Sequence, residues 1–367
     1  MYCSGFALRP QLAGMKSTKR VVIVGGGLSG MTLAYRLRKE KLNVTILEAA
    51  SRLGGRIQTI AGKLGTPLEL GATWFADQHS QLTGLLDELG LEKYPQFSEG
   101  ISLFQTKSFE PAQQFHVPAG DIPSYRVAGG TEALIDALAG RLGSATVLIN
   151  RRVNAIKDAE EGLIVETCGG EVFGAHLVVV CIPPQLAAAT IAFSPELPSS
   201  VRDVLPQVQT WMAGAVKFVL EYATPFWREK GYSGMLYSHA GIITEMYDHT
   251  NKQEDRFGFT GFLAGSAAGY SPAVRQELVL HQLTVLLGEE AGKPTAYFDR
   301  VWNDDLVVSG HHVVVRPHQN QGHPSLQLPY MNGKLFLCST EVAQRDPGYM
   351  EGAVYAATSV AERIAFA

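Results

Sequence analysis

A glycine-rich turn between a buried strand pattern and a helix pattern is the feature that most constrains this chain. Residues 21–24, VVIV, form an apolar, β-branched run typical of a strand buried on both faces. Glycines follow at once with the spacing G-x-G-x-x-G, at Gly25, Gly27 and Gly30. In this motif the first glycine turns tightly, the second lets backbone approach a pyrophosphate, and the third lets helix pack on strand. Leu28 and Ser29 begin the helix, whose N-terminus would face the negative charge of the ligand.

A second strand, residues 44–47, ends at Glu48. In nucleotide-binding folds of this kind, a carboxylate roughly 20 residues beyond the glycines binds a ribose hydroxyl, and the position of Glu48 is close to that distance. Such an acid, with Ala49 beside it, favours a free 2′-hydroxyl over a 2′-phosphate. The glycines alone would also suit a tight strand–helix turn without a ligand. The whole series of strand, glycines, helix, strand and acid favours nucleotide binding.

The continuation 51–56, SRLGGR, distinguishes FAD from NAD. Two adjacent glycines, of which Gly55 is the second, allow another close approach of backbone to a ligand. Arg52 and Arg56 flank them, and a guanidinium can bind two phosphate oxygens at once. NAD-binding folds do not usually need this segment.

These motifs resemble those of the flavin-containing amine oxidase superfamily, which includes monoamine oxidases, polyamine oxidases and L-amino acid oxidases. The resemblance continues through later segments and covers nearly the whole chain from Arg20 onward; these segments are 70–74, 128–130, 182–184, 339–341 and 348–353. It implies an α/β fold in which a Rossmann-type FAD-binding domain is interleaved with an α+β substrate domain. The expected FAD-binding domain comprises residues 19–76, 126–205 and 300–367, and the substrate domain comprises 77–125 and 206–299.

Composition sets the broad class. With 367 residues, 46% of them hydrophobic and 18% charged, the chain can bury a core large enough for two domains. A formal net charge of −4 gives no electrostatic reason to expect a nucleic acid or an anionic membrane as partner. Residues 1–18 read as a loose leader, with Met15 as an alternative start. The chain ends within its last helix pattern without a membrane tail, so we expect a soluble protein. Its oligomeric state stays open.

Four cysteines lack the C-x-x-C spacing of a zinc site: Cys3, Cys168, Cys181 and Cys338. The last two lie in apolar runs, so we expect buried, reduced thiols of a cytoplasmic protein rather than a disulfide framework or a metal site.

The resemblance also assigns residues to the cofactor. It implies that Gly71, Ala72 and Thr73 pass beside the flavin ring, and that the backbone of Val153 meets the adenine. Glu341 is expected near the ribityl or pyrophosphate part, although Ser339 stands where relatives usually carry glycine. Residues 348–353, which include Met350, open a final helix whose N-terminus would face the pyrimidine edge of the flavin.

Lys217 is the only charged residue among the first ten residues of the strand-like apolar pattern 211–222. Period-2 counting places it on one face with Ala213 and Ala215. A lysine in such surroundings is ordinarily an edge residue that extends to water. The resemblance instead implies a catalytic lysine that holds a water against flavin N5. It also makes Tyr349 an aromatic residue beside the reacting carbon of the substrate.

The segment from Trp302 to His312 departs from the family pattern. Monoamine oxidases carry a cysteine here that is bonded to the flavin, followed by an aromatic wall of the substrate cage. This chain has His311 and His312 at those places. A thioether link is therefore impossible here and FAD is expected to bind noncovalently, with a histidyl link as the alternative. His312 would contact the substrate, and the incomplete cage puts a preference for aryl-alkyl amines in doubt.

Two helices give local expectations. In residues 272–287, the spacing of Val274, Leu278, His281 and Val285 predicts an apolar inner stripe with a packed core histidine. Thr131 is placed to cap the helix that follows the Gly129–Gly130 pair.

The resulting hypothesis is FAD-dependent oxidation of an amine C–N bond by hydride transfer to flavin N5. The product would be an imine and, after reoxidation by dioxygen, hydrogen peroxide. Two alternatives stay open: a desaturase or protoporphyrinogen-oxidase-like enzyme, and a flavin-binding protein that has lost catalysis.

Overall fold

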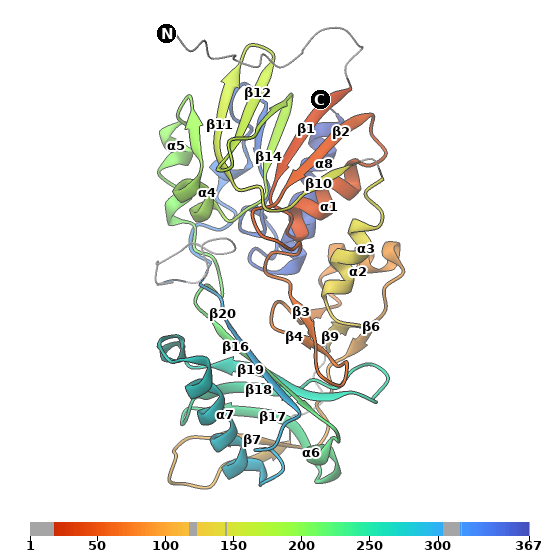
Figure 1. Ribbon diagram of the computed structural model, residues 1–367, viewed down its shortest axis with the longest axis vertical. Helices are drawn as coiled ribbons and strands as arrows, with labels where there is room; N and C mark the ends of the chain where they lie inside the picture. Colours follow the sequence, from red (N-terminus) through yellow and green to blue (C-terminus); the bar gives the residue numbers. More distant parts are fainter. Residues whose placement is uncertain (1–17, 117–122, 144, 304–315, 317, 367) are drawn as a thin grey trace, which may run out of the picture.

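The computed structural model describes residues 18–116, 123–143, 145–303, 316 and 318–366 (Figure 1). Its upper half in Figure 1 is built on a five-stranded sheet in which every neighbouring pair is parallel. The strand order is β10 (Thr146–Leu148), β2 (Leu42–Leu47), β1 (Lys19–Val24), β14 (Leu177–Val180), β21 (Leu335–Leu337). The predicted β1–turn–helix–β2 unit therefore forms the centre of this sheet.

Successive side chains of β1 point to opposite faces of the sheet, so they belong to two separate parts of the core in this half. Val21 and Ile23 pack toward a helical layer, whereas Val22 and Val24 pack toward a second sheet. The helical layer contains α1 (Leu28–Leu37), α2 (Ser80–Leu89), α3 (Glu132–Ala139) and α8 (Met350–Ala365). Because both faces of β1 are covered, its residues need no polar alternation, which explains the continuous VVIV run.

The second layer is a four-stranded sheet with short helices beside it. Its order is β13 (Val172–Ala175), β12 (Gly162–Thr167), β11 (Val153–Ala159), β15 (Ala192–Ser194). The helical segments are α4 (Pro184–Thr190), α5 (Ser199–Arg202), η1 (Leu205–Gln207) and η3 (Pro324–Gln327).

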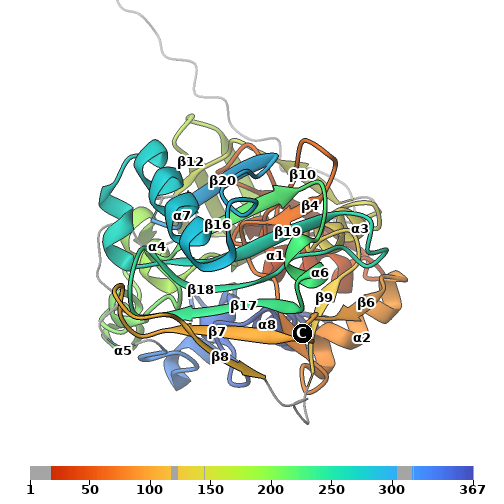
Figure 2. The same ribbon diagram turned by 90° about the horizontal axis from the view of Figure 1, so that it is seen from below.

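A seven-stranded sheet forms the lower half of the molecule (Figures 1 and 2). Its order is β20 (Ala296–Val301), β16 (Val216–Tyr222), β19 (Phe257–Leu263), β18 (Ile243–Asp248), β17 (Tyr232–Ser238), β7 (Ile101–Gln105), β8 (Gln113–His116). One face packs against α7 (Pro272–Leu287), and the short elements α6 (Phe226–Glu229) and η2 (Gly265–Gly269) complete this core.

Small sheets connect the two halves. One is the hairpin of β3 (Thr59–Ala61) and β4 (Pro67–Glu69), and the other comprises β5 (Phe75–Ala76), β9 (Ser124–Val127) and β6 (Lys93–Pro95). Leu68 and Leu70 pack on Val219 of β16, on the face of the large sheet opposite α7. This face is therefore the one turned toward the parallel-sheet half. The described part of the chain contains no helix that is both long and apolar enough to cross a membrane.

Two local expectations are wrong. The strand pattern from residue 211 begins only at Val216, because residues 211–214 form a turn in which Met212 has φ 63° and Gly214 has φ 79°. Period-2 counting holds within β16, where Val216, Phe218 and Leu220 belong to the core beneath α7. It does not extend back to Ala213.

The inner face of α7 is also different from the expectation. Val274, Leu278 and Val285 are exposed, and so is His281. The buried face carries Arg275, whose guanidinium donates to both carboxylate oxygens of Asp299 at 2.6 and 2.9 Å. The inner face of this helix therefore combines polar anchors to the sheet with the buried apolar residues Val279 and Leu283.

Candidate functional site

The first glycine turn has the geometry of a ligand cradle. Gly25 has φ 107°, a conformation that favours glycine. A Cβ at Gly30 would lie 2.0 Å from the carbonyl oxygen of Gly25, so helix α1 can approach the turn only without a side chain there. Gly27 precedes Leu28 and Ser29 and provides no side-chain cap. The N-terminus of α1 is thus left for an anionic ligand.

The second glycine segment lies against the first. The N–H of Gly54 donates to the carbonyl oxygen of Gly26 at 2.9 Å, and Gly27 and Gly54 form a bridge. The guanidinium of Arg52 donates to the carbonyl oxygens of Leu53, Gly55 and Ile57. Arg52 therefore stabilises this loop, a role that the sequence analysis did not foresee.

Glu48 anchors the other side of the turn. Its carboxylate accepts from the N–H groups of Gly26 at 2.6 Å and Ala50 at 2.7 Å. Burial raises the pKa of Glu48, although these hydrogen bonds oppose the shift. Glu48, Ala49 and Val153 line one groove, which is partly open to solvent. The groove brings together residues that the sequence analysis assigned separately to ribose and adenine.

The same groove includes residues that the sequence analysis missed. Arg151 and Arg152 directly precede Val153 and line the groove together with Thr190 of α4. Adjacency to Val153 was the available signal for both arginines.

Glu341 lies in η4 (Thr340–Val342) and is fully buried. Its Oε1 accepts from Arg56 Nη1 at 2.6 Å, whereas its Oε2 has no hydrogen-bond partner among the described residues. A buried carboxylate oxygen without a donor is costly unless a ligand supplies one. The structure thus brings together Arg56 and Glu341, which the sequence analysis assigned to the cofactor separately, and it leaves one carboxylate oxygen of Glu341 free to accept a hydrogen bond.

The N-terminus of α8 is fixed next to Glu341. The hydroxyl of Thr340 donates to the carbonyl oxygen of Tyr349 at 2.6 Å and accepts from the N–H of Gly348 at 2.9 Å. Met350, the first residue of α8, is buried, and no side chain caps the helix. Its first turn can therefore face a negatively charged group.

Lys217 lies on the face of β16 opposite α7 and is 2% exposed. Its Nζ donates to the carbonyl oxygen of Gly71 at 2.6 Å and to the hydroxyl of Thr73. Burial lowers the pKa of Lys217 to about 7, and the negative charge of Glu69 limits this shift. The structure thus brings together Lys217 and the segment 71–73, and it brings the pKa of the Lys217 ammonium close to neutral pH.

The space that a side chain at Gly71 would need is already filled by protein. A Cβ there would lie 2.3 Å from the carbonyl oxygen of Arg56 and 2.5 Å from the N–H nitrogen of Gln58. Gly71 is therefore required by backbone packing, and its carbonyl group serves Lys217.

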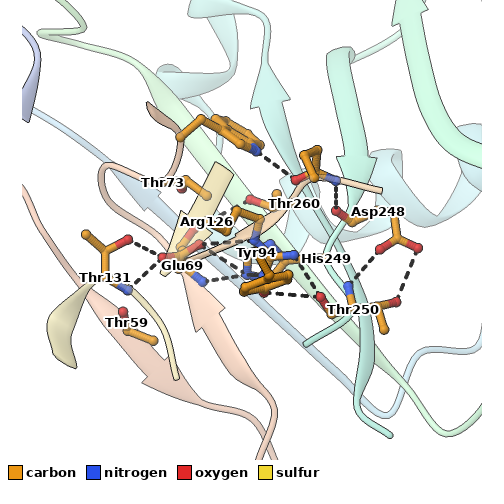
Figure 3. Close-up of polar contacts among 12 residues, drawn as sticks. Thr59, Glu69, Thr73, Tyr94, Arg126, Thr131, Asp248, His249, Thr250 and Thr260 are labelled. Atoms are coloured by element: carbon orange, nitrogen blue, oxygen red, sulfur yellow. Dashed lines mark hydrogen bonds and ion pairs between the residues drawn. The ribbon is translucent and has the colours of Figure 1, made fainter. Parts of the chain in front are cut away.

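A buried polar cluster, which we call the Glu69 cluster, consists of Glu69, Arg126, Thr131 and His249 (Figure 3). Glu69 Oε2 lies 3.7 Å from Arg126 Nε and 3.8 Å from His249 Nε2. His249 Nε2 accepts from the N–H of Glu69 at 3.1 Å. Burial and the charge of Arg126 hold the pKa of His249 well below its usual range, so this imidazole is neutral.

The Glu69 cluster also explains the start of α3. Both the N–H and the hydroxyl of Thr131 donate to Glu69 Oε1, whereas the Thr131 side chain caps no N–H of its own helix. The expected cap is therefore wrong in detail, because a residue from β4 supplies the acceptor.

Tyr349 has aromatic neighbours that the sequence analysis did not single out. Its ring centroid lies 4.5 Å from Trp211, 6.1 Å from the stacked ring of His318 and 5.9 Å from His79. The Tyr349 side chain is 38% exposed. His311 and His312, the predicted cofactor and substrate neighbours, lie outside the described residues.

These groups fit a dinucleotide flavin better than a metal. The glycine cradle, the Glu48 groove and the unpartnered oxygen of Glu341 offer donors and acceptors suited to phosphate, ribose and hydroxyl groups. Among the described residues, no three histidine, cysteine or acidic side chains are grouped as metal ligands.

Comparison with known proteins agrees with this description. Residues 28–123 and 98–365 match the family model described as flavin containing amine oxidoreductase. The chain is 25% identical to a probable flavin-containing monoamine oxidase A of Dictyostelium discoideum, covering 95% of this chain and 98% of that relative. It is 26% identical to putrescine oxidase of Kocuria rosea, and that match covers 76% of this chain and 81% of that relative.

A solved structure of putrescine oxidase bound to putrescine superposes with a TM-score of 0.81 at 23% identity. The match covers 96% of this chain and 100% of that structure. This likeness supports the α/β fold predicted from the sequence.

Proposed function

Because the chain belongs to the family of flavin containing amine oxidoreductases, we propose that it oxidises the carbon–nitrogen bond of a small amine with noncovalently bound FAD. The predicted family is confirmed, and the chain is an FAD-dependent oxidoreductase. When bound, the flavin would supply the acceptor for a hydride from the carbon next to nitrogen, which leaves an imine. Reoxidation by dioxygen would give hydrogen peroxide.

The observation that carries the proposal is the position of Lys217. Its buried ammonium contacts the Gly71 carbonyl and the Thr73 hydroxyl, in the segment assigned to the flavin ring. Burial lowers the pKa of Lys217 to about 7, so this side chain can change its protonation state near neutral pH. It can therefore hold a water by hydrogen bonding or pass a proton to one.

The surroundings of Lys217 favour a neutral amine. The rings of Trp74 and Phe262 have centroids 5.0 and 5.6 Å from Lys217 Nζ. A substrate amine would bind beside these rings and beside Lys217, which is charged part of the time. Both neighbours make it easier for the amine to lose its proton. Hydride loss requires the neutral amine, so this environment assists the reaction. Tyr349, with Trp211 and His318 beside it, would supply an aromatic wall for the substrate carbon.

Residues of the parallel-sheet half, and of the loops next to it, would hold FAD. Val153 and Glu48 would bind the adenosine part, and the α1 N-terminus would bind the pyrophosphate. Arg56, Glu341 and Met350 would contact the remainder of the cofactor. Precipitation with acid tests the noncovalent state, because FAD then remains in the supernatant.

The test of function uses the purified flavoprotein under anaerobic conditions. A panel of amines should bleach the oxidised flavin spectrum, and subsequent oxygen should restore it with release of peroxide. Bleaching by carbon–carbon or tetrapyrrole donors only would indicate the desaturase-like or protoporphyrinogen-oxidase-like alternative. A spectrum that no donor changes would indicate a degenerate flavin-binding protein.

Lys217→Met tests the proposed catalytic residue. We expect flavin reduction or reoxidation to slow by at least about 100-fold, which is the lower end of the contribution that proton-transfer groups typically make to a rate. Lys157→Met is the matched control, because Lys157 pairs with Glu166 at the surface. Equal turnover in the two variants would remove Lys217 from the mechanism.

A further inference from the structure

The large sheet aligns one side chain from each of several strands beside Lys217. Lys217 of β16 pairs with Phe262 of β19, and Phe262 pairs with Glu245 of β18. Glu245 pairs in turn with Tyr237 of β17. Directly paired residues project from the same face of a sheet. This row therefore lies on the face opposite α7, the same face from which Lys217 reaches Gly71.

Glu245 is a partly buried carboxylate without a cationic partner among the described residues. Tyr247 donates its hydroxyl hydrogen to Glu245 Oε1. The hydroxyl oxygens of Tyr247 and Tyr237 lie 2.7 Å apart. Burial, followed by the hydrogen bond to Glu245, raises the pKa of Tyr247, so the phenol stays protonated and keeps donating. Within the described part of the chain, Glu245 Oε2 accepts no hydrogen bond.

Aromatic rings line the interval between Lys217 and Glu245. Trp74 lies 5.1 Å from the ring of Tyr247, edge to face, and 6.3 Å from the ring of Phe262. Tyr237 contacts Tyr247 edge to face at 6.2 Å. A carboxylate next to aromatic faces attracts ammonium groups through both its charge and the ring quadrupoles. An uncharged substrate tail would instead leave this carboxylate without a counter-charge.

We propose that Glu245, positioned by Tyr247 and Tyr237, binds a second cationic group at the far end of the substrate. The preferred substrate is then an amine with a terminal ammonium several carbon atoms from the reacting nitrogen. Two strand spacings, about 10 Å, separate the backbones at Lys217 and Glu245. This inference rests on the proposed amine oxidation and adds the class of amine to it.

The test compares a series of α,ω-diamines with monoamines of equal carbon number. In the unmodified enzyme, the kcat/KM for the best diamine should exceed that for its matched monoamine. In Glu245→Gln, the ratio of these two values should fall by about 10-fold to 100-fold, as expected for the loss of one charge-assisted hydrogen bond. Glu277→Gln is the matched control, because Glu277 is exposed on α7; its ratio should equal that of the unmodified enzyme.

Anaerobic stopped-flow measurements separate binding from chemistry. For Glu245→Gln with the diamine, the apparent Kd for flavin reduction should rise more than the limiting rate falls. Tyr247→Phe keeps the ring and removes the O–H group, so its ratio should fall in the same direction by a smaller factor. A diamine-to-monoamine ratio that is unchanged in Glu245→Gln would overturn the proposal.

Calorimetry with the diamine distinguishes this proposal from the proposed function. If no amine bleaches the flavin, amine oxidation fails as the function. Binding of the diamine that weakens in Glu245→Gln, and not in Glu277→Gln, would still support the cation site. Equal binding to all three proteins, or no binding to any, would overturn it.

Discussion

Replacing Glu69 by glutamine removes one negative charge from the Glu69 cluster and keeps nearly the same shape. The substituted amide can still accept from the N–H of Thr131, which now donates to Oε1 at 2.8 Å. Arg126, 2% exposed, would lose the carboxylate 3.7 Å from its Nε. Breaking a buried pair by removing one partner typically costs about 3–5 kcal/mol. We expect the free energy of unfolding to fall by that amount.

Urea denaturation followed by circular dichroism measures this change. Glu166→Gln is the matched control, because it breaks an ion pair of 2.7 Å with Lys157 that is solvent-exposed. Exposed pairs contribute about 0–1 kcal/mol, so the control should change stability little. The two variants undergo the same chemical change and differ in burial.

A double variant checks the cause. If the unpaired charge of Arg126 is responsible, Glu69→Gln with Arg126→Met should be less destabilised than the sum of the two single changes. Glu69→Gln that costs no more than Glu166→Gln would refute the reasoning. The guanidinium would then be satisfied by its hydrogen bond to the carbonyl oxygen of Thr250 at 2.8 Å.

Two further predictions follow from the same structure. Gly30→Ala should abolish FAD retention during gel filtration, because its Cβ would lie 2.0 Å from the Gly25 carbonyl oxygen; Gly84→Ala in α2, with open space around it, should retain FAD and be no less stable. Lys217 has a pKa lowered to about 7, so between about pH 7 and 10 the unfolded chain binds a proton that the folded protein lacks. Stability should therefore rise with pH in this window, by up to about 1.4 kcal/mol per unit relative to Lys217→Met; parallel stability curves for the two proteins would contradict this.

The nucleotide unit could be predicted because its signals are local. The strand 21–24, the glycine spacing and Glu48 lie within one short segment, and hydrogen bonds within that segment form most of the cradle. The inner face of α8 could be predicted for the same reason. Met350, Val354, Ala357, Ala361 and Ile364 share one helical face and are all buried.

The face of α7 and the start of β16 could not be predicted in the same way. The stripe with Leu278 lies outside, because the face that packs on the sheet is the one with Val279 and Leu283. Arg275 and Gln282 bind partners on the sheet from this same inner face. Before β16, residues 211–214 form a turn in which Met212 and Gly214 have positive φ, and Gly214 donates to the carbonyl oxygen of Trp302 in a distant segment. Periodicity describes one element and contains no information about such partners.

The sequence by itself determined that this chain builds a βαβ unit for a dinucleotide, since glycine spacing, β-branched runs and a terminal acid act through neighbouring residues. Only the tertiary structure decided what surrounds Lys217, Glu341 and Tyr349. Lys217 loses its preference for charge because strands far apart in the chain exclude water from it. The row from Lys217 to Glu245 likewise exists only through the register of three strands, because side chains distant in sequence become neighbours only when backbone hydrogen bonds align them.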